Sequence, residues 1–464
     1  MFTPISNEHI TFLSNLLQER CFVDSINRKK YSHDETEDIS ILPDIVLKPK
    51  NTKEVSEILR YCNEKKICIT PSGARTGLSG GAIPLNNGIA LSMEKFDSIL
   101  SIDENNLQVT TEPGVITQVL QEAVKEKGLF YPPDPASKGS CFIGGNVSEN
   151  SGGPKAVKYG VTADYVLNLE VVLPTGEIIW TGANVLKNAT GYNLTQLIVG
   201  SEGTLGIITK IVLRLIPHPT NDLLMLVPFY DAQEACKAVT AIFKHGITPS
   251  GLEFMERDAL VWTRDFLNDD SIKIGDNHAA HLLIEVDGFD SDVLMNECSK
   301  IMQVLEQFET DEVLFAESQA QKDTLWKLRR SVGEAVKANS VYKEEDTVVP
   351  RYELPTLLHH VKEIGKKYGF NSVCYGHAGD GNLHVNIIKG EMSDEQWTNE
   401  LSVAIRELFE EVVKLKGTLS GEHGIGLVQK NYMDIVFPPK SLEIMKSIKN
   451  TFDPNGIMNP GKIF

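Results

Sequence analysis

The stretch PSGARTGLSGG (71–81) decides the fold of this chain, together with a second glycine-rich stretch over residues 139–160. Four of the 36 glycines lie in the first stretch and six in the second. Glycine lets backbone amides approach a ligand closely, and amides that point into one concavity bind a pyrophosphate group. Arg75, Thr76 and Ser79 add further donors. The two stretches together predict a nucleotide-type cofactor, because tight turns alone rarely require two such clusters.

Helix and strand patterns alternate around these glycines. An apolar period of 3.6 residues over 52–66, with Thr52 as the N-cap, predicts a helix, and ICITPSG (67–73) predicts a strand that runs into the first glycine loop. A second helix is expected over 116–123. The segment DYVLNLEVVLPTGEIIWTG (164–182) predicts two antiparallel strands about a PTGE turn. The expected fold class is therefore α+β.

Three parts are expected along the chain. The glycine-rich character fades at Pro217 and Pro219, which places a boundary near residue 218. We expect a cofactor domain over 1–218, with its core at 40–217, and a substrate or cap domain with an antiparallel sheet over 219–415. A C-terminal segment, 416–464, is expected to return to the cofactor domain. A chain of 464 residues with 41% hydrophobic content can bury cores of this size.

Composition excludes several classes of partner. The 45 basic and 63 acidic residues give a formal charge of -18, which repels nucleic acid and anionic lipid surfaces. The start MFTPISNEHI lacks the basic and apolar blocks of a signal peptide, and we find no apolar run long enough to span a bilayer. We expect a cytoplasmic protein whose membrane contact, if any, is peripheral at the inner membrane.

Two cofactor classes are disfavoured. The glycine stretches do not read G-x-G-x-x-G, so the fingerprint of a nicotinamide Rossmann domain is missing. The cysteines form no CxxC pair and are odd in number, which argues against disulfides and an iron-sulfur centre within the chain. These seven residues are Cys21, Cys62, Cys68, Cys141, Cys236, Cys298 and Cys374.

A histidine-bearing hairpin is predicted by SVCYGHAGDGNLHVNII (372–388), which has two β-prone runs about the turn AGDGN. His377 and His384 flank the turn and can converge on one metal ion. Side chains alternate along a strand, so Asn386 shares a face with His384 and is a candidate substrate contact. A histidine in a hairpin is usually structural, but three of only 11 histidines lie in two glycine-rich stretches.

The second of these stretches, SGEHGIG (420–426), offers a third ligand. Glu422 supplies a carboxylate, and His423 stands beside it. Two imidazoles and one carboxylate leave coordination positions open for a substrate. We therefore predict a divalent-metal site at His377, His384 and Glu422.

Four stretches of the first domain carry a family resemblance: PSGARTGLSGGAIP, YPPDPAS, IGGNVSENSGGPKAVKYGVTADYV and VGSEGTLGIITKIVLRL. They resemble the FAD domain of the vanillyl-alcohol oxidase superfamily over most of residues 40–217, which implies a two-lobed FAD-binding domain. Some relatives attach FAD covalently through a His in the first loop, and this loop has none, which implies non-covalent FAD. The implied FAD-binding residues are Pro71, Ser72, Gly73, Arg75, Thr76, Gly77, Leu78, Ser79, Pro133, Asp134, Ser137, Gly144, Gly145, Asn146, Gly152, Glu202, Gly203 and Ile208.

The motifs GHAGDGNLHVN and SGEHGIG resemble the C-terminal signature of FAD-linked D-lactate, D-2-hydroxyglutarate and glycolate dehydrogenases. The resemblance spans essentially the whole chain and implies oxidation of a small D-2-hydroxy acid. It implies metal binding by His377, His384 and Glu422, with Zn as first choice and Mn or Fe open. It also implies His423 as the catalytic base and Arg329 as the arginine that binds the substrate carboxylate. The expected substrate-binding residues are therefore Arg329, the hairpin residue Asn386, and His423.

The residues after Arg329 bear on the choice of acid. Relatives that handle 2-hydroxyglutarate have Thr four residues after this arginine and Lys eleven residues further on, whereas this chain has Gly333 and Glu344. Lys343 is one residue out of register, so in a strand it would face the other way. An acidic residue near the substrate tail repels a second carboxylate. We therefore expect D-lactate first, glycolate next and D-2-hydroxyglutarate third.

Several alternatives stay open at this stage. The electron acceptor is a quinone, an electron-transferring flavoprotein, a cytochrome or an iron-sulfur partner subunit. The chain is then a catalytic subunit, as in glycolate oxidase, or an electron-transfer flavin subunit of a larger complex. A homodimer is also open.

Overall fold

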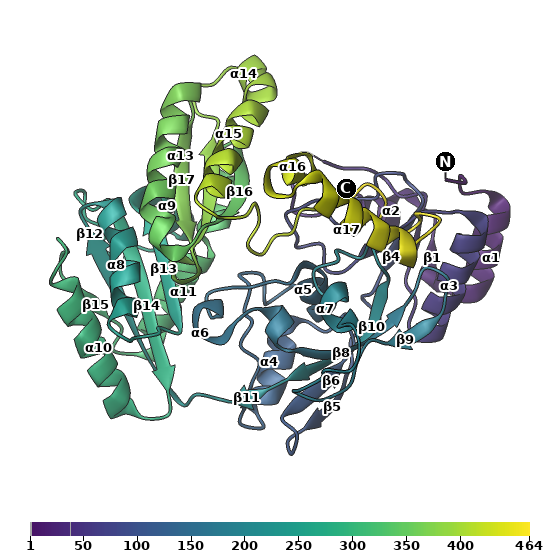
Figure 1. Ribbon diagram of the computed structural model, residues 1–464, viewed down its shortest axis with the longest axis horizontal. Helices are drawn as coiled ribbons and strands as arrows, with labels where there is room; N and C mark the ends of the chain where they lie inside the picture. Colours follow the sequence, from purple (N-terminus) through teal and green to yellow (C-terminus); the bar gives the residue numbers. More distant parts are fainter. Residues whose placement is uncertain (1, 38) are drawn as a thin grey trace. The chain divides into compact units, whose positions relative to one another are not determined.

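A computed structural model describes residues 2–37 and 39–464, and the chain divides into two compact units (Figure 1). Unit 1 comprises 1–152, 161–218 and 422–464, and unit 2 comprises 153–160 and 219–421. Antiparallel sheets and helices occur in both units, which confirms the predicted α+β class.

The first sheet of unit 1 has four strands in the order β1 (Cys21–Phe22), β2 (Ile45–Leu47), β4 (Ile89–Ser92) and β3 (Ile69–Ser72). The last three run parallel, and α1 (Asn7–Leu17) and α3 (Thr52–Lys65) pack on them. Helix α3 starts at Thr52, as does the predicted range 52–66. Its N-cap is Asn51, not Thr52, because the Asn51 side chain accepts the Glu54 N–H at 3.0 Å.

The second sheet of unit 1 has five antiparallel strands in the order β5 (Ile99–Asp103), β6 (Gln108–Thr111), β10 (Ile207–Arg214), β8 (Val166–Val172) and β9 (Ile178–Trp180). Strands β8 and β9 pair about the PTGE turn, as predicted. Helices α4 (Thr117–Lys125), α5 (Ile143–Glu149) and α7 (Leu194–Ile198) also belong to this unit, as does the short pair β7 (Leu129–Phe130) and β11 (Ile216–Pro217). The two sheets form the two lobes expected of the FAD-binding domain.

The C-terminal residues pack within unit 1. Helices α16 (Met433–Val436) and α17 (Pro439–Phe452) lead into an extended tail. Met458 forms a parallel bridge with Ile69, and the Asn459 N–H donates to the Ile69 carbonyl at 2.7 Å. The tail thus extends the first sheet at the edge formed by β3.

Unit 2 is built on a seven-stranded antiparallel sheet in the order β15 (Leu314–Phe315), β12 (Asn221–Phe229), β14 (Ala280–Gly288), β13 (Gly251–Glu256), β17 (Asn371–Gly376), β18 (Asn382–Ile388) and β16 (Tyr342–Val348). Helices α9 (Arg257–Leu267), α11 (Gln319–Arg330) and α12 (Val332–Asn339) pack on the face that carries Met255 and Tyr375. The alternate residue Phe254 is also buried, so both faces are covered. Contacts to the sheet also come from α8 (Ala232–Lys244), α10 (Ser291–Leu305), α13 (Leu354–Tyr368) and α15 (Leu401–Lys414).

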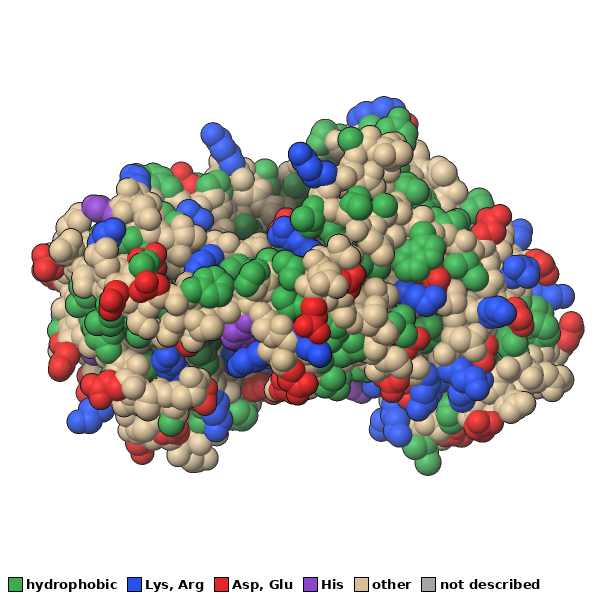
Figure 2. All heavy atoms as spheres, turned by 90° about the horizontal axis from the view of Figure 1, so that it is seen from below, with side chains coloured by type: hydrophobic (Ala, Val, Ile, Leu, Met, Phe, Trp, Pro, Cys, Tyr) green, Lys and Arg blue, Asp and Glu red, His purple; other side chains and the backbone are tan. Residues whose placement is uncertain are grey.

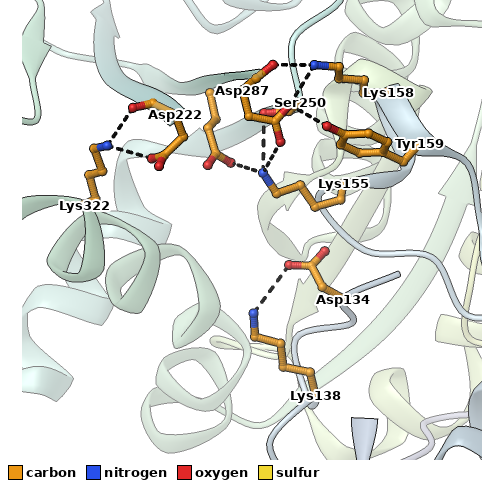
Figure 3. Close-up of polar contacts among 10 residues, drawn as sticks. Asp134, Lys138, Lys155, Lys158, Tyr159, Asp222, Ser250, Asp287 and Lys322 are labelled. Atoms are coloured by element: carbon orange, nitrogen blue, oxygen red, sulfur yellow. Dashed lines mark hydrogen bonds and ion pairs between the residues drawn. The ribbon is translucent and has the colours of Figure 1, made fainter. Parts of the chain in front are cut away.

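Two segments group with unit 2, although the sequence boundaries assigned them elsewhere. Residues 153–160, inside the predicted cofactor domain, are held to β14 by ion pairs (Figure 3). The Lys155 Nζ lies 2.8 Å from the Glu285 carboxylate and 3.2 Å from that of Asp287, and the Lys158 Nζ lies 2.7 Å from Asp287. Burial opposes ionisation of Asp287, but the two lysines hold the pKa of this carboxyl below its usual value.

The second of these segments, 416–421, precedes the predicted third metal ligand. Thr418 and Val348 exchange backbone hydrogen bonds, and the Gly421 N–H donates to Asp346 at 2.8 Å. These contacts attach the segment to β16, so it belongs with the sheet and not with the C-terminal helices.

The surface carries both signs of charge. On the face drawn in Figure 2, acidic and basic side chains lie interspersed. Within the described residues, no helix combines the length and apolar character that crossing a bilayer requires.

Candidate active site

Three of the stretches expected to bind FAD meet within unit 1. A Cβ on Gly73, in the loop after β3, would lie 3.9 Å from Phe142 and 4.0 Å from the Gly145 Cα. A Cβ on Gly203 would contact the Pro71 ring. The first glycine loop, the start of α5 and the turn before β10 are therefore neighbours, although they are far apart in the sequence.

These loops have room and donors for a phosphate-bearing cofactor. A Cβ on Gly77 or Gly145 would meet no atom within 4 Å, so open space lies beside both residues. The hydroxyls of Ser72 and Ser79 are buried and have no hydrogen-bond partner among the described residues. Buried hydroxyls normally find a partner, and a phosphate oxygen would supply one. The first loop therefore fits the group that the sequence predicts.

Other predicted FAD residues have contacts of their own. The Arg75 guanidinium lies 4.3 Å from the Tyr31 ring centroid. Asn146 donates to the Thr117 hydroxyl at 2.7 Å. The Asp134 carboxylate lies 3.7 Å from the Lys138 ammonium (Figure 3). The remaining residues lie in the same three stretches or beside them: Thr76 and Leu78 in the first loop, Gly144 in α5, Gly152 after it, Ile208 on β10, and Pro133 and Ser137, like Asp134, before α5.

The histidine hairpin of unit 2 has the geometry of a metal site. Strands β17 and β18 pair antiparallel, with Tyr375 opposite His384. The rings of His377 and His384 lie 5.5 Å apart between centroids, and each ring offers a nitrogen within 4.8 Å of the other. Gly381 closes the turn at φ +80°, where a Cβ would collide with the Val349 carbonyl oxygen. The turn therefore requires glycine, and it brings both imidazoles to one point.

Glu253, which the sequence did not suggest, orients both His377 and Arg329. It lies on β13 and is 0% exposed. The His377 Nδ1 lies 2.9 Å from both Glu253 carboxylate oxygens, and an Arg329 guanidinium nitrogen lies 2.7 Å from one of them. When Nδ1 donates to a carboxylate, the lone pair of a neutral ring is on Nε2, and this arrangement is typical of metal-binding histidines. The sequence carries one signal that could have pointed to Glu253, which is its place as an acidic residue within the apolar strand GLEFME.

Asp346 and Glu344, on β16, lie beside His384 on the same face of the sheet. The His384 Nδ1 is 3.5 Å from the Asp346 carboxylate and 3.4 Å from that of Glu344. Asp346 also accepts hydrogen bonds from the Ser420 hydroxyl at 2.9 Å and the Gly421 N–H at 2.8 Å. One buried carboxylate thus links the second histidine to the segment that leads into Glu422.

Two of the three predicted substrate-binding residues, Arg329 and Asn386, lie at the same face. The buried Arg329 guanidinium is 5.0 Å from the Tyr375 ring centroid, and this ring is 5.1 Å from that of His384. Both Asn386 amide atoms are buried and form no hydrogen bond of good geometry with the described residues. Asn386 is paired with Glu344 on the neighbouring strand. A buried polar group of one cation, two imidazoles and one amide therefore forms in unit 2.

Glu422 and His423 directly follow the last residue of unit 2 and belong to unit 1. A Cβ on Gly152 would lie 3.1 Å from the Glu422 carboxylate. The backbone N–H groups of Ile425 and Gly426 donate to Glu202. The loop that carries both residues is therefore held by the FAD-binding unit.

Comparison with known proteins shows the family. The chain matches "FAD binding domain" over residues 43–182 and "FAD linked oxidases, C-terminal domain" over 218–463. It is 36% identical to a D-lactate dehydrogenase of Anaerostipes hadrus, covering 100% of this chain and 98% of the relative. It is 39% identical to the glycolate oxidase subunit GlcD of Bacillus subtilis (strain 168), covering 94% and 92%. It is 34% identical to a D-2-hydroxyglutarate dehydrogenase of Stutzerimonas stutzeri (strain A1501), covering 95% of each chain.

Solved structures of lower identity share the fold. p-Cresol methylhydroxylase superimposes with a TM-score of 0.80 at 18% identity, covering 98% of this chain and 96% of that one. 4-Ethylphenol oxidase from Gulosibacter chungangensis superimposes with a TM-score of 0.78 at 18% identity, covering 100% and 98%. The predicted vanillyl-alcohol oxidase type of fold is thereby confirmed. The chain belongs to the FAD-linked oxidases, in which an FAD-binding domain is joined to the C-terminal domain of this family, and it is an FAD-linked oxidoreductase.

Proposed function

We propose that this protein is an FAD-dependent dehydrogenase that oxidises a short D-2-hydroxy acid, D-lactate above all, to the 2-oxo acid. The observation that carries the proposal is a buried group in which Glu253 contacts Arg329 and His377, and His384 lies beside His377. In this group, Arg329 is a cation that can bind a substrate carboxylate, and His377 and His384 can ligate a metal ion. The names of the relatives, which are D-lactate, glycolate and D-2-hydroxyglutarate enzymes, agree with this class of substrate.

The metal would be held by His377, His384 and Glu422. The Glu253 carboxylate on the Nδ1 of His377 fits a ligating imidazole, and Gly421, next to Glu422, is tied to Asp346 beside His384. A divalent ion that binds the hydroxyl and carboxylate oxygens of the acid lowers the pKa of the hydroxyl. Zn suits this ligand set best, and Mn and Fe also accept it.

FAD would be held non-covalently by the loops of unit 1, with Ser72 and Ser79 toward its phosphates. Bound FAD supplies the hydride acceptor. We assign the remaining steps to residues of the chain. Arg329 binds the substrate carboxylate through its planar guanidinium, Asn386 contacts the substrate through its amide, and His423 takes the hydroxyl proton as a neutral imidazole.

The proposal is tested by anaerobic addition of D-lactate to the purified chain. We expect the absorbance of oxidised flavin to bleach, because in this proposal the chain with its bound FAD and metal oxidises the substrate without a partner protein. The same sample is analysed for metal. A flavin that stays oxidised with D-lactate, glycolate and D-2-hydroxyglutarate would reject the proposal.

The GlcD relative, named as a subunit, favours a second candidate in which the chain works within a larger complex. In this form the acid bleaches the flavin of the isolated chain, and the flavin stays reduced until a quinone, an electron-transferring flavoprotein, a cytochrome or an iron-sulfur partner subunit is supplied to accept the electrons. A chain that accepts electrons only from such a partner, and not from any acid, would be an electron-transfer subunit.

Glu344 supports a monocarboxylic substrate. Residues 342–348 form a strand, so Lys343 faces away from His384 while Glu344 faces the same way as His384. The side chain of Glu344 is only 8% exposed, and in such a place its charge would repel a second carboxylate of the substrate. Gly333 lies nearby, since a Cβ there would be 3.3 Å from the Tyr375 hydroxyl. We therefore rank D-lactate above glycolate and glycolate above D-2-hydroxyglutarate.

Glu344→Gln is expected to raise the ratio of kcat/KM for D-2-hydroxyglutarate to that for D-lactate by about 10-fold, which corresponds to about 1.4 kcal/mol of relieved repulsion. Steady-state kinetics with both acids and an artificial acceptor measure the ratio, and metal content is checked because Glu344 lies near His384. Lys343→Gln, on the opposite face, is the matched control and should leave the ratio unchanged. A wild-type preference for D-2-hydroxyglutarate would overturn the ranking.

A further inference from the structure

A buried cluster of acidic groups lies in unit 1, outside the substrate-binding surface of unit 2. Asp34 and Glu202 are each 6% exposed, Lys462 is 3% exposed, and the Glu149 Oε2 is buried. The charges of Asp34, Glu149 and Glu202 all act on the Lys462 ammonium, which is the buried cation of this cluster. Full ionisation would leave two negative charges in excess in the protein interior, which is prohibitively costly, so the cluster must retain a proton.

Hydrogen bonds show which carboxyl group is the anion. The Ile425 N–H donates to one Glu202 oxygen at 2.8 Å, and the Gly426 N–H donates to the other at 2.7 Å. Backbone N–H groups that donate to a carboxylate favour its charged form. The Glu149 Oε2 has no hydrogen-bond partner among the described residues. Glu149 is therefore the member that is better suited to hold the proton.

The electrostatic environment agrees with this order. Burial, and after it the charge of Glu202, raises the pKa of Glu149 well above its usual value. Burial raises the pKa of Glu202 to about 7, against the opposing effect of the two N–H groups. Burial lowers the pKa of Lys462 to about 8, although Asp34 and Glu202 oppose the shift. Glu149 thus has the larger tendency to stay neutral.

The two carboxyl groups lie beside the turn that follows His423. A Cβ on Gly424 would collide with the Glu149 Oε2 and lie 3.1 Å from a Glu202 oxygen, and Gly424 has φ +83°. Further along the turn, the Leu427 N–H donates to the Ser79 carbonyl at 2.8 Å. The turn is therefore fixed on one side by the acidic pair and on the other by the first glycine loop.

A bound cation is a weaker explanation than a proton. Among the described residues, the sets of three ligand atoms that lie within 4.8 Å of one another involve other side chains. Asp34, Glu149 and Glu202 do not meet this spacing. We therefore assign the neutralisation of the excess negative charge to a proton on one of the carboxyl groups.

We propose that Glu149 and Glu202 form a carboxyl pair with one proton, held by Glu149, and that the pair positions the turn that carries His423. The proposal rests on the proposed function for the role of His423, but the protonation of Glu149 is independent of that role. Both glutamates are positioning residues. The anion Glu202 accepts the two backbone N–H groups, while neutral Glu149 lies beside it without charge repulsion.

The two glutamates should respond differently to replacement by glutamine. Glu149→Gln replaces a neutral acid by a neutral amide, so flavin reduction should stay within about 3-fold of wild type. In Glu202→Gln, the NH2 group of the new side chain faces a backbone N–H, so one hydrogen bond that holds the turn is lost. This variant should lower kcat by about 10-fold or more with little change in KM. Glu149→Leu, which removes the polar group, should lower kcat by about 10-fold, whereas Glu149→Gln should keep it. Equal losses in Glu149→Gln and Glu202→Gln, or full activity in Glu202→Gln, would overturn the proposal.

Infrared spectroscopy of the full-length holoenzyme tests the proton without using activity. The difference spectrum between wild type and Glu149→Gln should contain a protonated-carboxyl band that shifts in D2O. A difference spectrum that contains carboxylate bands but no protonated-carboxyl band would show that Glu149 is ionised and would overturn the proposal, even if Glu202→Gln fails to fold. If the band is found but no acid reduces the flavin, the proposed function fails and the assignment of the proton stands.

Discussion

His423→Asn is expected to slow reduction of the flavin by D-lactate by about 100- to 10,000-fold, the usual contribution of general base catalysis. Asparagine is polar and of similar size, but it cannot accept the hydroxyl proton. The turn after residue 423 is held by Glu202 and Ser79 through backbone hydrogen bonds, which the substitution leaves in place. FAD and metal should therefore stay bound at wild-type levels.

Anaerobic rapid mixing with D-lactate measures this rate directly, because the flavin absorbance follows the chemical step. His359→Asn is the matched control, since His359 is an exposed histidine on α13, and it should reduce its flavin at the wild-type rate. Near-normal reduction by His423→Asn would reject His423 as the base. Loss of FAD from this variant would instead show that the residue is structural.

The local features of the fold could be read from the sequence because they depend on neighbouring residues. The hairpin at 372–388 has its turn and both strands within 17 residues, and the structure has strands at Asn371–Gly376 and Asn382–Ile388. The apolar residues Leu401, Leu408 and Val412 have a helical spacing, but the structure has two helices in this region, α14 (Asp394–Asn399) and α15, which are separated at Glu400. Periodicity shows which face is apolar, but it does not show such a break.

Long-range partners could not be read in this way. Glu253 lies 124 positions before His377 in the sequence, and only the pairing of β13 with β17 places their strands side by side. The link from Asp346 to Ser420 likewise depends on a contact across 74 positions. The sequence therefore suggested the side chains that we propose as metal ligands, whereas the carboxylates beside them required the sheet order.

Loss of His384, which we propose as a metal ligand, is expected to have the second large effect. His384→Ala should lose most of its bound metal, and flavin reduction should fall by about 1,000-fold, because metal-assisted polarisation contributes about 4 kcal/mol. Chelation of the metal from wild type should have the same effect, reversed by adding back Zn, Mn or Fe. Metal analysis and anaerobic flavin reduction on the same samples measure both quantities.

The control must separate loss of a metal ligand from loss of a buried imidazole. His281 lies on β14 of the same sheet and is 1% exposed, compared with 4% for His384. Burial lowers the pKa of His281 to about 3, so this ring is neutral as a ligand would be. His281→Ala should lower stability through lost packing but keep its metal and its rate. The two variants should differ in metal content, because of these two histidines only His384 has Asp346 and His377 beside it. Equal metal content in His384→Ala and His281→Ala, or full activity of metal-free wild type, would exclude the metal site.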